Sequence, residues 1–222
     1  LKNGVLLDTP FGFQENVEIL AAKTAEYFTD AVSRHVDIAG LARTDHGDVV
    51  GIETAIAKIR AADWVFAGPG SPTFALRQWA GTPIPDSIGA KLRDGGAVVF
   101  SSAAALTLGR KTIPVYEVYK SGADPYWVDG LDLLTAIGLP VVVIPHYDNA
   151  EGGTYDTRFC YLGSSRLFPC RHLSTFVRSG IHVPSLVLPF PFCRCCPSHF
   201  HPYLWHPSKH ADWSPSAGEL RK

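Results

Sequence analysis

Methionine is absent from this chain of 222 residues, which begins at Leu1, so we expect a fragment or a trimmed product that lacks the first strand of its domain. Neither sign of charge predominates, because 20 Lys and Arg face 21 Asp and Glu. This balance argues against nucleic acid or an anionic membrane as a partner. No apolar run is long enough to span a bilayer and no signal-like segment opens the chain, so we expect a cytoplasmic protein.

The last quarter of the chain has little acid and no amide. After Gly163 the acidic residues are Asp212 and Glu219, Asn and Gln are missing, and prolines recur too often for long helices or central strands. This composition resembles out-of-frame translation of a GC-rich gene, and we hypothesise that residues 164–222 form such a tail, out of frame or disordered. The competing interpretation is a zinc site, but the order C-x-C-C-x-x-H-x-H lacks the usual paired ligand spacing. We therefore expect no metal and no cofactor.

Residues 1–163 alternate between strand-like and helix-like segments. Short apolar runs alternate with segments whose apolar residues recur at helical spacing, which predicts an α/β domain with a mainly parallel sheet between two layers of helices, a three-layer sandwich. Strands are expected at 4–9, 35–42, 63–68, 97–101 and 139–146, and helices at 14–28, 49–62, 73–79 and 87–96.

Three of the expected strand ends carry residues suited to chemistry: Gly68 to Pro72, Ser101 to Ala105, and Pro145-His146. In parallel sheets, ligands gather at the carboxyl ends of the strands. The amides of the first segment can face an anion, although no third glycine or Walker lysine supports a dinucleotide or phosphate loop. Without further context, a simple strand-to-helix turn explains that segment equally well.

The serines at the second strand end have two interpretations. Ser102 precedes three alanines, the small neighbours that a nucleophile on a sharp strand-to-helix turn needs. Phe100 stands where such turns have a glycine, and Ser101 or Ser102 can instead cap the helix that follows. Local sequence favours the cap. His146 at the third end is placed to act as a general base toward a serine, while a lone loop histidine is more often structural.

Taken together, "FAGPGSPTFALRQW", "GGAVVFSSAAALTLG" and "VIPHYDNAEGG" resemble the class I glutamine amidotransferase-like superfamily, a flavodoxin-like fold. The likeness covers residues 1–163 and lies in the branch of the serine peptidases cyanophycinase and aspartyl dipeptidase. "PVYEVYKSGADPYWVDGLDLL" fits a type 1 glutamine amidotransferase-like subgroup better than the peptidases. The resemblance implies Ser102 as nucleophile and His146 as base. It also implies that the amides of Gly70 or Ser71, with that of Ala103, hold an oxyanion.

The resemblance also concerns the third catalytic residue and the substrate. Relatives supply an acidic residue from the C-terminal third, after the histidine, and in this chain that region is the atypical tail, so we expect an impaired hydrolase unless a local acid replaces it. We assign Glu151 to this role, with Asp148, Asp156 and Glu117 as alternatives. Arg158 is a candidate for a substrate carboxylate, or forms a surface ion pair. A serine at the turn disfavours glutamine hydrolysis through a thioester.

Two functions follow from these residues. The first is a serine hydrolase of peptidase or amidase type that acts on a small peptide or amide. The second is a non-catalytic amidotransferase-like domain that binds a small ligand or a partner at the same strand ends.

Overall fold

The computed structural model describes residues 2–44, 49–146 and 186–187. Within these residues no helix combines the length and the apolar character that crossing a membrane requires. The cysteine- and histidine-rich tail predicted for residues 164–222 lies outside the described residues, apart from Leu186 and Val187.

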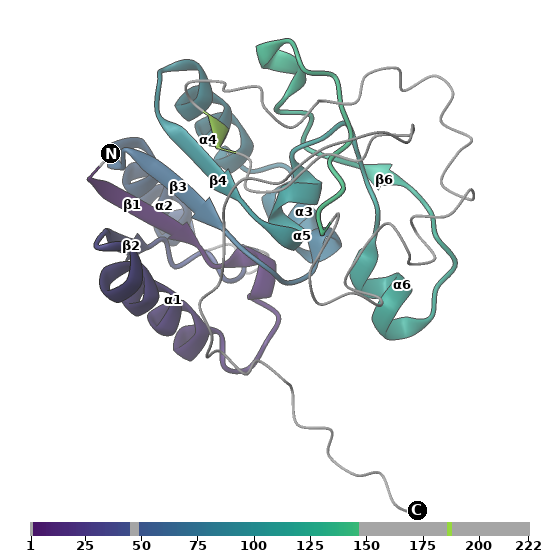
Figure 1. Cartoon of the computed structure of the whole chain (residues 1–222), viewed down its shortest axis with the longest axis horizontal. Helices are drawn as coiled ribbons and strands as arrows, with labels where there is room; N and C mark the ends of the chain where they lie inside the picture. The colour runs from purple at the N-terminus through teal and green to yellow at the C-terminus, as the bar shows by residue number, and fades with distance from the viewer. Residues whose placement is uncertain (1, 45–48, 147–185, 188–222) are drawn as a thin grey trace, which may run out of the picture.

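A five-stranded parallel sheet forms the centre of the fold (Figure 1). Its strands lie in the order β2-β1-β3-β4-β7, and every neighbouring pair is parallel. The strands are β1 (Asn3–Leu7), β2 (His35–Ile38), β3 (Trp64–Ala67), β4 (Ala97–Phe100) and β7 (Leu186–Val187). The order reverses direction at β1, so β1 and β3 mark the switch point at which α/β sheets open a crevice at their carboxyl ends.

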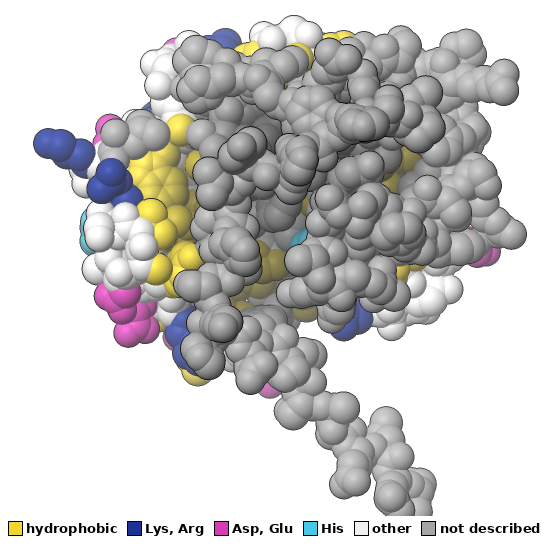
Figure 2. Space-filling view, in the orientation of Figure 1, with side chains coloured by type: hydrophobic (Ala, Val, Ile, Leu, Met, Phe, Trp, Pro, Cys, Tyr) yellow, Lys and Arg dark blue, Asp and Glu magenta, His cyan; other side chains and the backbone are white. Residues whose placement is uncertain are grey.

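Helices cover both faces of the sheet. Successive strand residues point to opposite sides, so the apolar strands present hydrophobic side chains on both faces. Val5 and Leu7 join a core with residues of α2 (Val49–Ala61), α3 (Pro72–Trp79) and α4 (Ile84–Arg93). Leu6 points the other way and packs with α1 (Val17–Val32). Figure 1 shows α1 nearer the viewer than the sheet and α2 behind it. Hydrophobic side chains lie over the strands beside α1 in Figure 2. The molecule is therefore a three-layer sandwich.

Most of the remaining elements follow β4 in the chain. The short helix α5 (Ser102–Thr107) continues directly from the strand, and α6 (Val115–Ser121) packs near α3. The strands β5 (Lys111–Thr112) and β6 (Val128–Asp129) form a separate antiparallel pair. The 3-10 helices η1 (Thr9–Phe11) and η2 (Thr135–Ile137) follow β1 and β6.

The α/β fold with a mainly parallel sheet is confirmed, and four of the five expected strands and all four expected helices occur within a few residues of their predicted positions. The strand predicted at 139–146 is wrong, because these residues form no helix or strand. Val141 and Val143 are buried, as the apolar run indicates, but the Val141 carbonyl accepts a hydrogen bond from the Arg110 amide at 3.0 Å. The edge of β4 pairs instead with β7.

Candidate functional site

The carboxyl ends of three strands meet at one edge of the sheet. The pairing register aligns Leu7 with Ala67 and Ala67 with Phe100. The segments after these residues therefore begin side by side: Asp8 after β1, Gly68 after β3 and Ser101 after β4. The Ser101 amide donates to the Ala67 carbonyl at 2.9 Å, and the Ala104 amide donates to the Gly68 carbonyl at 3.2 Å. These bonds hold the glycine loop against the start of α5.

Ser102 adopts a left-handed backbone conformation with a φ of 50°. A residue with a side chain rarely takes this conformation, and it costs on the order of 1–3 kcal/mol wherever surrounding structure enforces it. Strain of this kind marks the sharp strand-to-helix turn that exposes a nucleophilic serine in α/β hydrolases. The neighbouring Ser101 occupies the N-cap position of α5, but its side chain makes no capping hydrogen bond. The side-chain cap that local sequence favours is therefore not formed.

The hydroxyl of Ser102 contacts the imidazole of His146. Their Oγ and Nε2 atoms are 2.9 Å apart, which is hydrogen-bonding distance, although 44 residues separate them in sequence. His146 itself has a φ of 62°, so both members of this pair sit on strained backbone. Both side chains are half-buried. A serine and a histidine in this relation have the geometry of a nucleophile and its general base.

The sharp serine turn of α/β hydrolases has a glycine two residues before and two residues after the nucleophile. Phe100 and Ala104 stand at these two positions relative to Ser102. Phe100 is fully buried and its ring lies 6.1 Å from that of Trp79, in the core behind the turn. Ala104 is also fully buried, and its amide donates both to the Gly68 carbonyl and to the Ser101 carbonyl, the latter at 3.1 Å. Small residues at 103–105 let α5 lie close to the loop that carries Gly68. The turn therefore forms without the flanking glycines.

The loop after β3, Gly68 to Pro72, is hydrogen-bonded to the segment that follows β1. The Ser71 amide donates to the Pro10 carbonyl at 2.8 Å. Gly70 has a φ of 145°, and a Cβ atom at this position would lie 1.9 Å from the same carbonyl oxygen. This close approach requires glycine. The Ser71 amide, one of the two amides predicted for an oxyanion, therefore donates to the Pro10 carbonyl instead.

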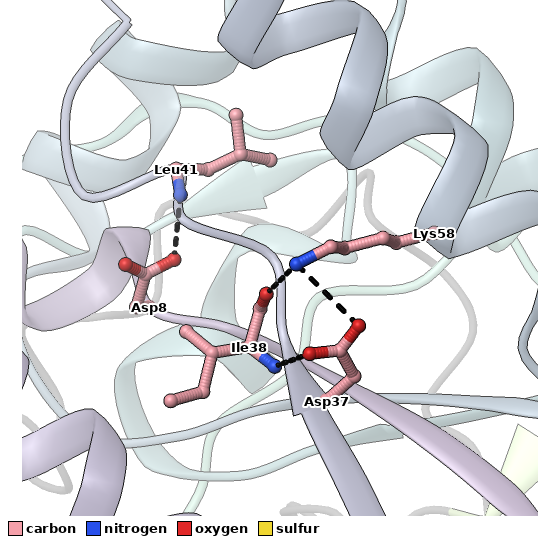
Figure 3. Close-up of polar contacts among 5 residues, drawn as sticks. All are labelled: Asp8, Asp37, Ile38, Leu41 and Lys58. Atoms are coloured by element: carbon pink, nitrogen blue, oxygen red, sulfur yellow. Dashed lines mark hydrogen bonds and ion pairs between the residues drawn. The ribbon is translucent and has the colours of Figure 1, made fainter.

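Polar contacts connect the segments at the carboxyl ends of β1 and β2 (Figure 3). Asp8 is 4% exposed and accepts a hydrogen bond from the Leu41 amide at 2.8 Å. Burial raises the pKa of the Asp8 carboxyl, against the opposing effect of backbone hydrogen bonds and Lys58. Lys58 in turn bonds the Ile38 carbonyl at 2.6 Å and lies 3.4 Å from Asp37. The ends of β1 and β2 are thereby joined.

Thr9 links this edge to α3. Its hydroxyl donates to the Leu41 carbonyl at 2.8 Å and accepts a hydrogen bond from the indole nitrogen of Trp79 at 3.0 Å. The sequence predicts functional residues at three expected strand ends, and the strand end at 8–11 is not among them. The signal was present, since an Asp-Thr-Pro sequence directly follows a buried strand.

Three side chains form a hydrogen-bonded chain from α6 to the glycine loop. Ser71 caps α3 by accepting from the Phe74 amide at 3.1 Å, and its Oγ lies 2.9 Å from the Thr73 hydroxyl. Thr73 donates to Oε1 of Glu117. The other carboxyl oxygen, Oε2, is buried and has no hydrogen-bond partner among the described residues. Glu117, an alternative for the orienting acid, therefore contacts the loop through Thr73.

The other predicted site residues are placed as follows. Ala103 directly follows Ser102 and is buried at the start of α5. Glu151 and Arg158, together with Asp148 and Asp156, lie outside the described residues. Within residues 2–44 and 49–146, no group of three His, Cys, Asp or Glu side chains is arranged to hold a metal ion.

Comparison with solved structures relates this fold to that of peptidases. A peptidase from an acI-B1 Actinobacterium superimposes with a TM-score of 0.53 at 16% identity, over 67% of this chain and 57% of that protein. This chain thus spans less than two thirds of the length of that peptidase. A protein provisionally named peptidase E, from Listeria monocytogenes EGD-e, gives a TM-score of 0.48 at 16% identity, over 67% of this chain and 68% of that protein.

Comparisons of the sequence with family models and with curated proteins find no match. The similarity therefore concerns the fold, which this chain shares with a peptidase.

Proposed function

We propose that this chain is a serine hydrolase of peptidase or amidase type, with Ser102 as nucleophile and His146 as general base. The observation that carries the proposal is the Ser102 hydroxyl, held on left-handed backbone at a strand end with its Oγ 2.9 Å from the imidazole Nε2. The peptidase fold supports it. The class I glutamine amidotransferase-like superfamily remains our proposal for the wider relationship.

The chemistry follows the order common to serine hydrolases. His146 takes the hydroxyl proton of Ser102 while Oγ attacks the carbonyl carbon of a peptide or amide bond. The carbonyl oxygen becomes an oxyanion, and the amides of Gly70 and Ala103 are our candidates to bind it. His146 then gives its proton to the leaving amine. Water attacks the acyl group on Ser102, and the same imidazole acts again as base.

The orienting acid stays a prediction at Glu151. In serine proteases, loss of this group lowers turnover by about 10⁴-fold, because the histidine no longer holds the productive tautomer. Arg158 stays a prediction for a carboxylate on the substrate. The proposed substrate is a small peptide or amide, and hydrolysis of glutamine through a thioester is disfavoured because the turn carries Ser102.

A fluorophosphonate probe tests the nucleophile without knowledge of the substrate. We expect intact-mass spectrometry to find one adduct on the parent chain and none on Ser102→Ala. Ser101→Ala is the matched control, because it removes the adjacent hydroxyl, which makes no capping bond, and it should still be labelled.

Equal labelling of the parent and Ser102→Ala would refute the assignment. If neither protein were labelled while both gained thermal stability from the same small ligand, the chain would be a non-catalytic binding domain.

A further inference from the structure

We propose that Glu117 and Thr73 are positioning residues, which hold the Gly70 amide in place for the oxyanion. This inference rests on the proposed function of the site. It concerns the three side chains that connect α6 to the glycine loop, Glu117, Thr73 and Ser71, which we call the relay.

The protons of the relay have one consistent direction. The single hydroxyl proton of Thr73 goes to Oε1 of Glu117, so the Thr73 oxygen is left to accept from Ser71. The Ser71 oxygen meanwhile accepts from the Phe74 amide. Each hydroxyl thus donates once and accepts once, and a carboxyl acceptor ends the chain. Hydrogen bonds connected in this way polarise and strengthen one another.

The relay holds the side chain of Ser71, whose backbone is held separately by Pro10. Ser71 donates its amide to the Pro10 carbonyl, while its side chain is held by Thr73 and by the Phe74 amide. The backbone and the side chain of Ser71 are therefore anchored to different elements. The peptide group between Gly70 and Ser71 cannot rotate without breaking one of these bonds. The Gly70 amide belongs to the preceding peptide group, between Pro69 and Gly70, and the relay limits its movement because Ser71 fixes the Gly70 Cα, which already lies against the Pro10 carbonyl.

Burying the carboxyl group of Glu117 costs free energy, which a purely structural role does not explain. Oε2 is buried without a hydrogen-bond partner among the described residues, and such a group normally requires an explanation in function or in an additional contact. A leucine here would fill the space without a buried polar atom. The carboxyl group supplies the acceptor that orients Thr73, which leucine does not.

Two matched pairs of variants test the relay. Thr73→Val removes the hydroxyl at nearly constant volume, and Thr73→Ser restores it. Glu117→Leu removes the acceptor, and Glu117→Gln keeps an oxygen that accepts from Thr73. The control is Thr24→Val, because the Thr24 hydroxyl donates within its own helix, to the Leu20 carbonyl at 2.8 Å.

The first readout is labelling by the fluorophosphonate, separated into the maximal rate and the half-saturating concentration. A 1 Å misplacement of a catalytic group lowers rates by up to about 100-fold. We expect Thr73→Val and Glu117→Leu to lower the maximal rate by about 10-fold to 100-fold with the half-saturating concentration unchanged. Thr73→Ser, Glu117→Gln and Thr24→Val should stay near the parent rate.

The second readout is hydrogen exchange of the peptide that contains residues 68–74, which does not depend on activity. Loss of one hydrogen bond should speed this exchange by about tenfold in Thr73→Val and leave it unchanged in Thr24→Val. Unchanged exchange in Thr73→Val would overturn the inference, as would a labelling rate equal to the parent's. Absence of labelling in the parent would instead refute the proposed function, and exchange would still decide whether the relay holds the loop.

Discussion

Gly70→Ala is the substitution that the structure most clearly forbids. The added Cβ would lie 1.9 Å from the Pro10 carbonyl oxygen and 2.3 Å from its carbon. Ordinary contact begins at 3.4 Å, so the loop would have to retreat by about 1.5 Å. The backbone φ of 145° is also unfavourable for alanine.

The loss of stability in Gly70→Ala can be worked out from the backbone strain and from the hydrogen bond that the displaced loop would break. Left-handed strain costs about 1–3 kcal/mol, and loss of the hydrogen bond from the Ser71 amide to Pro10 costs about 1 kcal/mol. We therefore expect urea unfolding to show a loss of about 2–4 kcal/mol. Fluorophosphonate labelling should fall by about 100-fold, because the displacement exceeds the 1 Å that such a loss requires.

Gly81→Ala is the matched control. Gly81 has a φ of 71°, but an added Cβ would find no atom within 4 Å. This variant should lose about 1–2 kcal/mol through backbone strain alone and keep the parent labelling rate. If Gly70→Ala were labelled as fast as Gly81→Ala, Gly70 would not be part of the oxyanion site.

Two aspartates should change stability with pH in opposite directions. Burial raises the pKa of Asp8, so its contribution to stability is fully present below pH 3.8 and is lost as the pH rises through the raised value. In urea unfolding, the stability of Asp8→Asn relative to the parent should therefore increase from pH 3 to pH 7. A stability difference that stays constant over this range would contradict the prediction. Hydrogen bonds from the Asn3 and Lys2 amides lower the pKa of Asp63, so its contribution to stability is present above pH 3.8 and is lost as the pH falls through the lowered value. Asp63→Asn should therefore match the parent in the acid range and be less stable at pH 7, and equal stability at pH 7 would refute it.

The sheet could be predicted because its strands are short apolar runs between segments of helical period. Such patterns identify β1 to β4 and α1 to α4 from local sequence alone. The segment 139–146 shows the limit of this reasoning. Val141 and Val143 are buried and Val142 between them is half-buried, an alternation typical of a strand. The strand that pairs with β4 is nevertheless β7, because local periodicity carries no information about which segment occupies a sheet edge.

The candidate site could be predicted in part. Ser102 and His146 were paired from two expected strand ends, of which only the one before Ser102 forms, and from the family resemblance, while local sequence favoured a helix cap. The roles of Pro10 and Thr73 were not predictable, because they depend on the path of the loop over the end of β1. Any residue type can supply a backbone carbonyl that accepts a hydrogen bond from a nearby amide, so the sequence does not reveal such a contact.

The most direct measurement is the position of the covalent adduct. After labelling by a fluorophosphonate and proteolysis, tandem mass spectrometry of the peptide that contains both Ser101 and Ser102 distinguishes the two hydroxyls. We predict an adduct on Ser102 in the parent and a much slower reaction in His146→Ala, since the imidazole lies 2.9 Å from the attacking oxygen. An adduct on Ser101 or on any residue other than Ser102, or a rate that His146→Ala leaves unchanged, would contradict the proposed catalytic pair.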